Sequence, residues 1–169
     1  MNTKKRIRTY KWADPIETAE LVKKMSGNDF LKGVLKGELP APPIAETLDF
    51  HPLNMEIGKV SFEFIPQEFH YNPIGGVHGG VISTILDTVM GCALHSKLSQ
   101  GVGYTTLELK VNFIKAVIEK SGKLIAEGRL IHLGKTTALI EADLKNEDGI
   151  LYAHGVSTCM IFNVSTINK

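Results

Sequence analysis

The sequence predicts an α+β fold in which an antiparallel sheet wraps around one long, buried helix. Two observations lead to this prediction. The segment from about 79 to 97 is small or apolar at almost every position, which is typical of a helix that is buried on all sides. The segments with strand character are grouped together and do not alternate with helices, which favours an antiparallel sheet. The length of 169 residues fits one compact domain.

The first part of the chain is predicted to be helical over residues 13–38. Asp14 is a plausible N-cap, and Pro15 suits the first position of a helix. Residues 40–43 (PAPP) form an extended break. We therefore predict an N-terminal helical extension over 1–43, which is too short for a core of its own, and a main domain over 44–169.

The main domain begins with two short strand candidates, residues 47–56 and 58–66, on either side of Ile57-Gly58. After the long helix come four further strands, expected to follow one another as hairpins, at residues 105–114, 123–133, 137–145 and 150–162. Their turns are predicted at 120–123 (KSGK), 133–136 (LGKT) and 146–149 (NEDG). Gly128, inside the second of these strands, indicates a bulge or a close backbone approach.

Alternation in the strand at 105–114 predicts one apolar face, formed by Leu107, Leu109, Val111 and Phe113. The opposite, polar face would carry Thr106, Glu108, Lys110 and Asn112.

Composition excludes several classes of protein. With 19 basic and 18 acidic residues and no basic stripe, nucleic acid is not an expected partner. No apolar segment reaches the length of a membrane span, and no signal peptide is visible, so we expect a cytoplasmic protein that does not enter a membrane. Cys92 and Cys159 lie in apolar segments and are expected to be buried free thiols. The six histidines lack the spacing of zinc ligands, and no Gly-x-Ser-x-Gly motif is present.

Asp87 is the conspicuous exception in the long apolar helix. A buried carboxylate without partners costs several kcal/mol, roughly, so it needs a reason to be there. It could face a solvated edge, or accept hydrogen bonds from Ser83, Thr84 or Thr88. It could instead line a functional site, for instance at a junction between subunits. Position 87 is two turns into the helix, beyond the reach of the positive N-terminal dipole.

The start of the same helix offers a second candidate site. Gly79 and Gly80 carry no side chains, so a ligand can approach their backbone N–H groups closely. Unpaired N–H groups at a helix N-terminus suit a developing oxyanion. His78 and Asn72 flank them on the incoming loop. Taken alone, His-Gly-Gly also fits an ordinary helix entry with a surface histidine.

Taken together, these motifs resemble a known family. The segment NPIGGVHGGVISTILD, with Asn72, His78-Gly79-Gly80 and Asp87, resembles the loop and helix of the PaaI-like thioesterases of the hotdog-fold superfamily. The resemblance covers roughly residues 45–163 and continues through GVGYTTLELKVNFIKAV and HLGKTTALIEADLKNEDGILYAHG. It implies a hotdog fold and hydrolysis of acyl-CoA thioesters. It also implies a homodimer, often a dimer of dimers, with active sites shared between chains.

The resemblance further implies roles for individual residues. The Gly79 N–H and the Asn72 amide would polarise the thioester carbonyl. Asp87 of the opposite subunit would activate water or, as the other option, attack directly to form an anhydride. His78 is expected to orient the loop, although proton transfer is an alternative.

Thr106 stands where the family places a Ser or Thr that helps to hold the water. A slip of one position would assign this role to Thr105. We favour Thr106 because the alternation places it on the polar face of its strand.

Coenzyme A, as part of the substrate and with no separate cofactor or metal, is expected at the sheet edge. Candidate contacts are Lys115 and the turn formed by Gly134, Lys135 and Thr136. Their ordinary interpretation is as turn and surface residues. This chain has Lys115-Ala116 where many relatives have Arg-Pro or Ser-Pro, which leaves the details of nucleotide binding open.

Two rival functions fit the same fold: a hydroxyacyl dehydratase or hydratase, and a non-catalytic acyl-CoA sensor. The former has a different loop sequence, and the latter has no use for a water-activating carboxylate. For a thioesterase, an aromatic or a medium-chain acyl group would fit. The depth of the acyl pocket would depend on which of Leu86, Met90, Leu94 and the N-terminal helices line it, and on how two chains meet.

Overall fold

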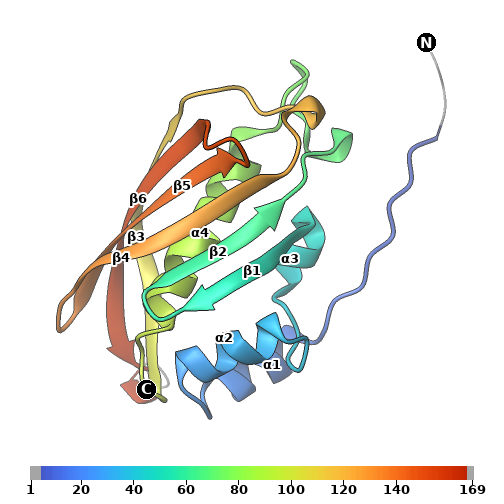
Figure 1. Ribbon diagram of the computed structural model, residues 1–169. Coiled ribbons are helices and arrows are strands. Elements are labelled where there is room, and N and C mark those ends of the chain that lie inside the picture. The colour runs from blue at the N-terminus through green and yellow to red at the C-terminus, as the bar shows by residue number, and fades with distance from the viewer. Residues whose placement is uncertain (1–4, 167–169) are drawn as a thin grey trace.

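A computed structural model describes residues 5–166 and shows a curved antiparallel sheet wrapped around a long helix, α4 (Gly79–His95) (Figure 1). The six strands follow the order β1-β2-β4-β5-β6-β3 in the sheet. Their bounds are β1 (Phe50–Glu56), β2 (Lys59–Phe64), β3 (Val102–Phe113), β4 (Leu124–Leu133), β5 (Thr137–Asn146) and β6 (Leu151–Asn163). This arrangement confirms the predicted fold. Within the described residues, no helix is both long and apolar enough to cross a membrane.

The core lies between α4 and the concave face of the sheet. Leu86, Met90 and Leu94 are fully buried on one side of the helix. Gly128 of β4 lies so close to the helix that a Cβ atom there would be 2.4 Å from the carbonyl oxygen of Val89. The second of the two explanations for Gly128, close backbone approach, is therefore correct. The irregularity in β4 lies between Leu130 and His132 instead.

The connection between β3 and β4 differs from the prediction. Residues 120–123 do not form a hairpin, because β3 pairs with β6 and β4 pairs with β2 and β5. A short 3-10 helix, η2 (Glu119–Ser121), begins a crossover from one side of the sheet to the other. The turns at 133–136 and 146–149 do join neighbouring antiparallel strands, as predicted. Turn residues identify a reversal of the chain, but they do not reveal which strands become neighbours.

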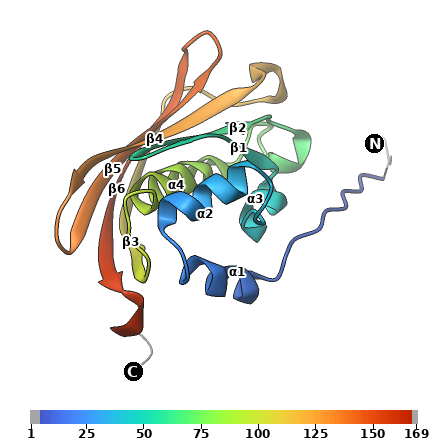
Figure 2. The same cartoon turned by 60° about the horizontal axis from the view of Figure 1, so that its bottom comes forward.

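The N-terminal region contains α1 (Pro15–Val22), α2 (Gly27–Leu35) and α3 (Pro43–Leu48). The Asp14 side chain caps α1 by accepting a hydrogen bond from the Ile16 N–H, with a distance of 2.7 Å. The third helix was not expected: it occupies the beginning of the predicted first strand, and Asp49, with φ of 56°, ends it. Figure 2 shows α2 beside α4 and α1 farther from the sheet.

The second helix joins the main core, because Phe30, Leu31 and Val34 are buried in the same cluster as the sheet and α4. In contrast to α2, the first helix α1 has no buried residue. The division between an extension and a main domain at residue 43 stays a prediction.

We expect Gly128→Ala to destabilise the protein by at least about 2 kcal/mol, because the new methyl group would overlap the helix backbone, which cannot move without disturbing the core. Urea unfolding followed by circular dichroism measures this loss. His132→Ala, at the exposed end of the same strand, is the control and should change stability little. A stable Gly128→Ala variant would contradict the proposed tight contact.

Candidate active site

Asp87 pairs with Thr106 across the space between α4 and β3. The Thr106 hydroxyl donates a hydrogen bond to Asp87 Oδ1 at 3.0 Å. Two of the three other proposed donors are occupied within the helix: the Thr84 hydroxyl donates to the Gly80 carbonyl, and the Thr88 hydroxyl donates to the Thr84 carbonyl. Thr106, and not Thr105, is therefore the strand residue placed against the carboxylate.

A bulge in β3 brings Thr106 to this position. The pairing with β6 shifts between Thr106 and Glu108, so that Leu107 is an extra residue. The predicted alternation of faces was therefore wrong across this point. Thr106 faces the helix, as do Leu109 and Val111 farther along, while Leu107 is 58% exposed. Periodicity cannot reveal a single inserted residue, because it assumes a regular strand.

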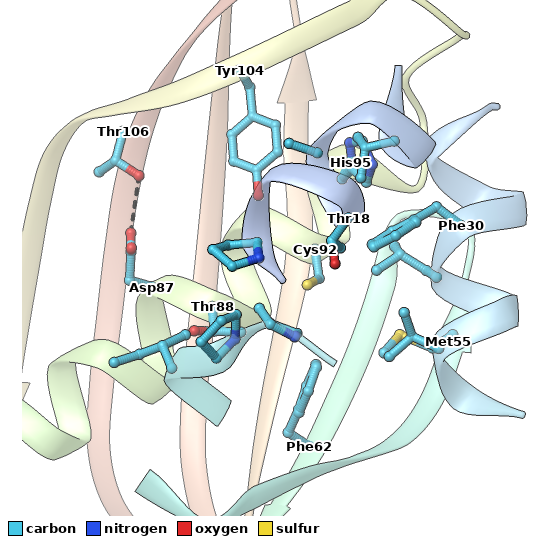
Figure 3. Close-up of a pocket in the computed structure, with 18 residues that line it drawn as sticks. Thr18, Phe30, Met55, Phe62, Asp87, Thr88, Cys92, His95, Tyr104 and Thr106 are labelled. Carbon is cyan, nitrogen blue, oxygen red and sulfur yellow. Dashed lines mark hydrogen bonds between the residues drawn. The ribbon is translucent and has the colours of Figure 1, made fainter. Parts of the chain in front are cut away.

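The Asp87–Thr106 pair lies at the edge of a cavity of about 420 Å³ beneath the N-terminal helices (Figure 3). The helices and the segment before α3 contribute one wall; β1, β2, β3 and α4 contribute the other. Its lining residues are mostly apolar: Pro15, Thr18, Ala19, Val22, Phe30, Leu31, Val34, Pro42, Pro43, Ile44, Met55, Phe62, Asp87, Thr88, Cys92, His95, Tyr104 and Thr106.

The cavity lies along one side of α4, and the three candidate lining residues of this helix lie on another side. Leu86, Met90 and Leu94 are fully buried against the core and do not line it. Thr88, Cys92 and His95 line it instead, together with Asp87. The spacing of these three residues, four and then three positions, is that of one helical stripe. A stripe of polar residues on an apolar helix was the available sequence signal for this face.

Burial favours the uncharged forms of Cys92, His95 and Tyr104 in the cavity. Burial, and to a smaller extent the charge of Asp87, raises the pKa of the Cys92 thiol to about 12. Burial likewise raises the pKa of Tyr104 well above its ordinary value and lowers the pKa of His95. Since a nucleophilic cysteine must be a thiolate, Cys92 is unsuited to that role at neutral pH.

The start of α4 is organised by His78. The Nδ1 atom of its ring accepts a hydrogen bond from the Gly80 N–H at 2.8 Å. The backbone N–H of His78 donates to the His70 carbonyl, also at 2.8 Å. The Val81 N–H donates to the His78 carbonyl. Within residues 5–166, the Gly79 N–H has no acceptor, so it is the donor of this first turn that remains open to a ligand.

Asn72 shapes the loop that leads to this helix. Its side-chain oxygen accepts hydrogen bonds from the N–H groups of Ile74 and Gly76, at 3.0 and 3.2 Å. This leaves its amide NH₂ group without an acceptor in the described chain. The Val77 N–H donates to the Val117 carbonyl and ties the loop to the segment after β3. The loop is thus fixed while one amide donor stays available.

Asn72 and Gly79 line a second cavity, of about 440 Å³, that shares no residue with the first. Asp87 lies eight residues after Gly79 on the same helix, a rise of about 12 Å. Within one chain, the carboxylate and the open N–H donors therefore do not meet.

The predicted coenzyme A contacts are divided in the same way. Lys115 lines the second cavity, and its ammonium lies 5.4 Å from the centre of the Tyr152 ring. Gly134, Lys135 and Thr136 form the turn between β4 and β5 and line neither cavity. The turn lies at the opposite end of the sheet from Lys115. Thr137, which follows the turn, and Thr105, near the start of β3, both pair with Met160 of β6.

Metal-binding side chains do not gather anywhere in the described part of the chain: no group of three or more His, Cys, Asp or Glu residues is placed to hold an ion. Both cysteines are free thiols. The arrangement thus offers a carboxylate and a hydroxyl, which can activate water, and open N–H donors, which can polarise a carbonyl.

Comparison with known proteins places the chain in a family. The family model of the thioesterase superfamily matches residues 74–153. Human acyl-coenzyme A thioesterase 13 is 30% identical over 103 residues, which cover 60% of this chain and 71% of that protein. This chain belongs to the thioesterase superfamily. As a thioesterase, it is an enzyme of the hydrolase class, and the fold and family predicted from the sequence are confirmed.

Solved structures of other proteins share its architecture. A phenylacetic acid degradation-related protein of Ralstonia eutropha JMP134 is 29% identical, with a TM-score of 0.68 over 77% of this chain and 98% of that chain. A Streptococcus mutans UA159 protein bound to acetyl CoA is 26% identical, with a TM-score of 0.61 over 68% and 89%. The E. coli PaaI protein, 18% identical, shares the fold, with a TM-score of 0.69 over 82% and 97%.

We expect the Cys92 thiol of this thioesterase to resist alkylation by iodoacetamide at pH 7.5, reacting at least about 100-fold more slowly than a free cysteine, because a pKa of about 12 leaves little thiolate. Mass spectrometry of the labelled protein measures this rate. Reactivity should rise with pH and should return in denaturant. Fast labelling of the folded protein at pH 7.5 would contradict the burial of this thiol.

Proposed function

We propose that this thioesterase hydrolyses acyl-CoA, with Asp87 of one chain activating water and Asn72 and Gly79 of a second chain polarising the carbonyl. The observation that carries the proposal is the Thr106–Asp87 hydrogen bond of 3.0 Å at the edge of a largely apolar cavity. Such a cavity suits an acyl chain, and the carboxylate stands where the reacting end of that chain would lie.

The reaction begins with water held by Asp87 and Thr106. The carboxylate takes a proton from the water while the water oxygen bonds to the thioester carbon. When the tetrahedral intermediate collapses, the carbon–sulfur bond breaks and the CoA thiolate takes the proton back from Asp87. The products are a free acid and CoA. Thr106 holds the carboxylate in place, which fixes the direction from which water approaches.

The negative charge that develops on the carbonyl oxygen needs donors. The Gly79 N–H is unpaired in the described chain and lies at the positive end of a helix of 17 residues. The Asn72 amide is the second donor, with its oxygen already committed to the loop. His78 orients this loop through its bond to the Gly80 N–H. Losing one such donor typically costs about 10²–10³ in rate.

A second chain is required because the base and the donors line separate cavities in one chain. The edge strand β3 suits such an interface. It pairs with β6 on one side only, and Leu107, Phe113 and Ile114 at or just after it are 58%, 55% and 55% exposed. We propose a homodimer in which two β3 edges meet, and an assembly of two such dimers.

Coenzyme A would lie at this junction, with Lys115 near its phosphates and the turn Gly134–Thr136 of the other chain beside the pantetheine. The Streptococcus mutans structure bound to acetyl CoA supports this class of ligand. Lys115 is exposed, as such a contact requires. The acyl group is aromatic or of medium length. The protein is proposed to act in the cytoplasm.

Asp87→Asn should lower kcat for acyl-CoA hydrolysis by at least about 10²-fold, because the amide cannot accept the proton from water. Thr106→Val, which keeps the side-chain shape but removes the hydroxyl, should lower kcat by about tenfold. Release of free CoA thiol from a panel of acyl-CoAs measures both. Thr105→Val on the neighbouring position is the matched control and should retain activity.

Unchanged turnover in Asp87→Asn would exclude this mechanism. Binding of acyl-CoA without any cleavage by the wild type would favour the acyl-CoA sensor instead.

Mixing two inactive variants tests whether the site is shared. In a heterodimer of an Asp87→Asn chain and an Asn72→Ala chain, one of two shared sites keeps both native residues. Random exchange of subunits should therefore restore about a quarter of wild-type activity. If each site lay within one chain, every site in the mixture would carry one of the substitutions. Absence of recovery after confirmed exchange would refute the shared site.

A further inference from the structure

The N-terminal helices supply more than half of the residues that line the first cavity, the one beside Asp87. These residues come from α1, from α2 and from the start of α3, all of them before residue 45. The family model matches residues 74–153, a segment that includes Asp87 and Thr106. The carboxylate therefore lies inside the matched segment, and the wall across the cavity from it lies outside that segment.

The cavity has a long axis along α4. Asp87 and Thr106 lie at one end, His95 and Phe30 lie at the other, and Thr18 of α1 lies between them (Figure 3). His95 is eight residues after Asp87, a distance of about 12 Å along the helix. An extended chain of about eight to ten carbon atoms has this length, at about 1.3 Å of advance per carbon–carbon bond. A phenylacetyl group is roughly half as long and would leave the far end empty.

The first helix covers this cavity without filling it. The face of α1 that lines the cavity consists of Pro15, Thr18, Ala19 and Val22, at the spacing of one helical stripe. A helix that packs on a core buries such a face, yet no residue of α1 is buried, and Ala19 is exposed. The inner face of α1 thus lacks packing partners, and a ligand in the cavity would supply them.

The side chains around the cavity indicate an apolar ligand. Away from Asp87, they include Phe30, Met55 and Phe62 (Figure 3). Neither Lys nor Arg lines the cavity, and Asp87 is its charged group. A carboxylate at the tail of a substrate would have no counter-charge there. The cavity therefore suits an acyl chain that is apolar to its end and has its thioester at the Asp87–Thr106 pair.

We propose that residues 15–34 form the acyl-binding wall of this thioesterase, and that Ala19 and Phe30 select an unbranched acyl chain of about eight to ten carbons. The inference rests on the proposed acyl-CoA hydrolysis and narrows its substrate class. Phe30 limits the chain at the far end of the cavity, and the small side chain of Ala19 leaves the middle open. Both residues contact the tail of the substrate and take no part in breaking the thioester bond.

A panel of acyl-CoAs tests the chain length. From butanoyl- to octanoyl-CoA, kcat/KM should rise about threefold for each added carbon, because each methylene group moves from water into the cavity. It should reach its maximum at octanoyl- or decanoyl-CoA, and phenylacetyl-CoA should be at least about tenfold poorer than that maximum. Equal kcat/KM values across the straight chains, or a maximum at phenylacetyl-CoA, would overturn the inference.

A larger side chain on α1 tests the position of the acyl chain. Ala19→Phe fills the middle of the cavity, so the ratio of kcat/KM for decanoyl-CoA to that for butanoyl-CoA should fall at least about tenfold. Glu17→Phe adds the same ring to the outer face of α1 and is the matched control, which should keep the wild-type ratio. An unchanged ratio in Ala19→Phe would overturn the inference.

A smaller side chain at the far end should have the opposite effect. Phe30→Leu opens space beyond the tail, so the ratio of kcat/KM for dodecanoyl-CoA to that for decanoyl-CoA should rise about threefold. Phe69→Leu, outside the cavity, is the control and should leave this ratio as it is. A folded Phe30→Leu variant with the wild-type ratio would overturn the assignment of Phe30.

Hydrogen exchange measures whether the ligand completes the packing of α1. In the free protein, the amides of residues 18–22 should exchange faster than those of α2, because α1 has no buried residue. The thioether S-decyl-CoA, which cannot be hydrolysed, should slow their exchange at least about tenfold, whereas S-butyl-CoA should not. Full protection of α1 without ligand would mean that a partner chain fills the cavity, and it would overturn the inference.

Binding of the same thioether keeps this inference distinct from the proposed hydrolysis. Calorimetry should show that Ala19→Phe binds S-decyl-CoA at least about tenfold more weakly than the wild type does. If this result is obtained but no thioester is cleaved, the hydrolysis proposal fails and the acyl site stands. Equal affinities, or unchanged exchange of α1 in the presence of S-decyl-CoA, would overturn the acyl site whatever the outcome for hydrolysis.

Discussion

The contact between Gly128 and the backbone of α4 is the constraint on which the rest of the structure depends. With no side chain at this position, β4 comes close enough for a helix carbonyl to occupy the space of a missing Cβ. The helix therefore lies deep in the concave sheet, with Leu86, Met90 and Leu94 turned into the core. Its remaining face, from Asp87 to His95, is directed at the N-terminal helices and β3.

This geometry separates two kinds of chemistry along one helix. The N-terminus of α4 carries the open Gly79 N–H, while the carboxylate lies two turns later. A helix is stiff, so these groups cannot approach each other by bending. Only a second copy of the helix can bring a donor end to a carboxylate. The walls of the cavity beside Asp87, in contrast, all come from one chain.

Much of this could be predicted from the sequence, because the informative features are local. A long run of small and apolar residues predicted α4, and a carboxylate inside that run drew attention to Asp87. The neighbours of β3 were mispredicted because a turn at 119–121 does not show where the next strand pairs. The sequence left open whether Leu86 faces the pocket or the core, because rotation of a helix that is apolar on all sides is set by packing and not by pattern.

The bulge at Leu107 has a consequence for how this sequence can diverge. Upstream of it, Tyr104 and Thr106 face the cavity; downstream, Leu109 faces the core on the same side of the sheet. Deleting one residue here would restore a regular strand and turn one of these two groups outward. Insertions and deletions in β3 that preserve this cavity would therefore have to come in pairs.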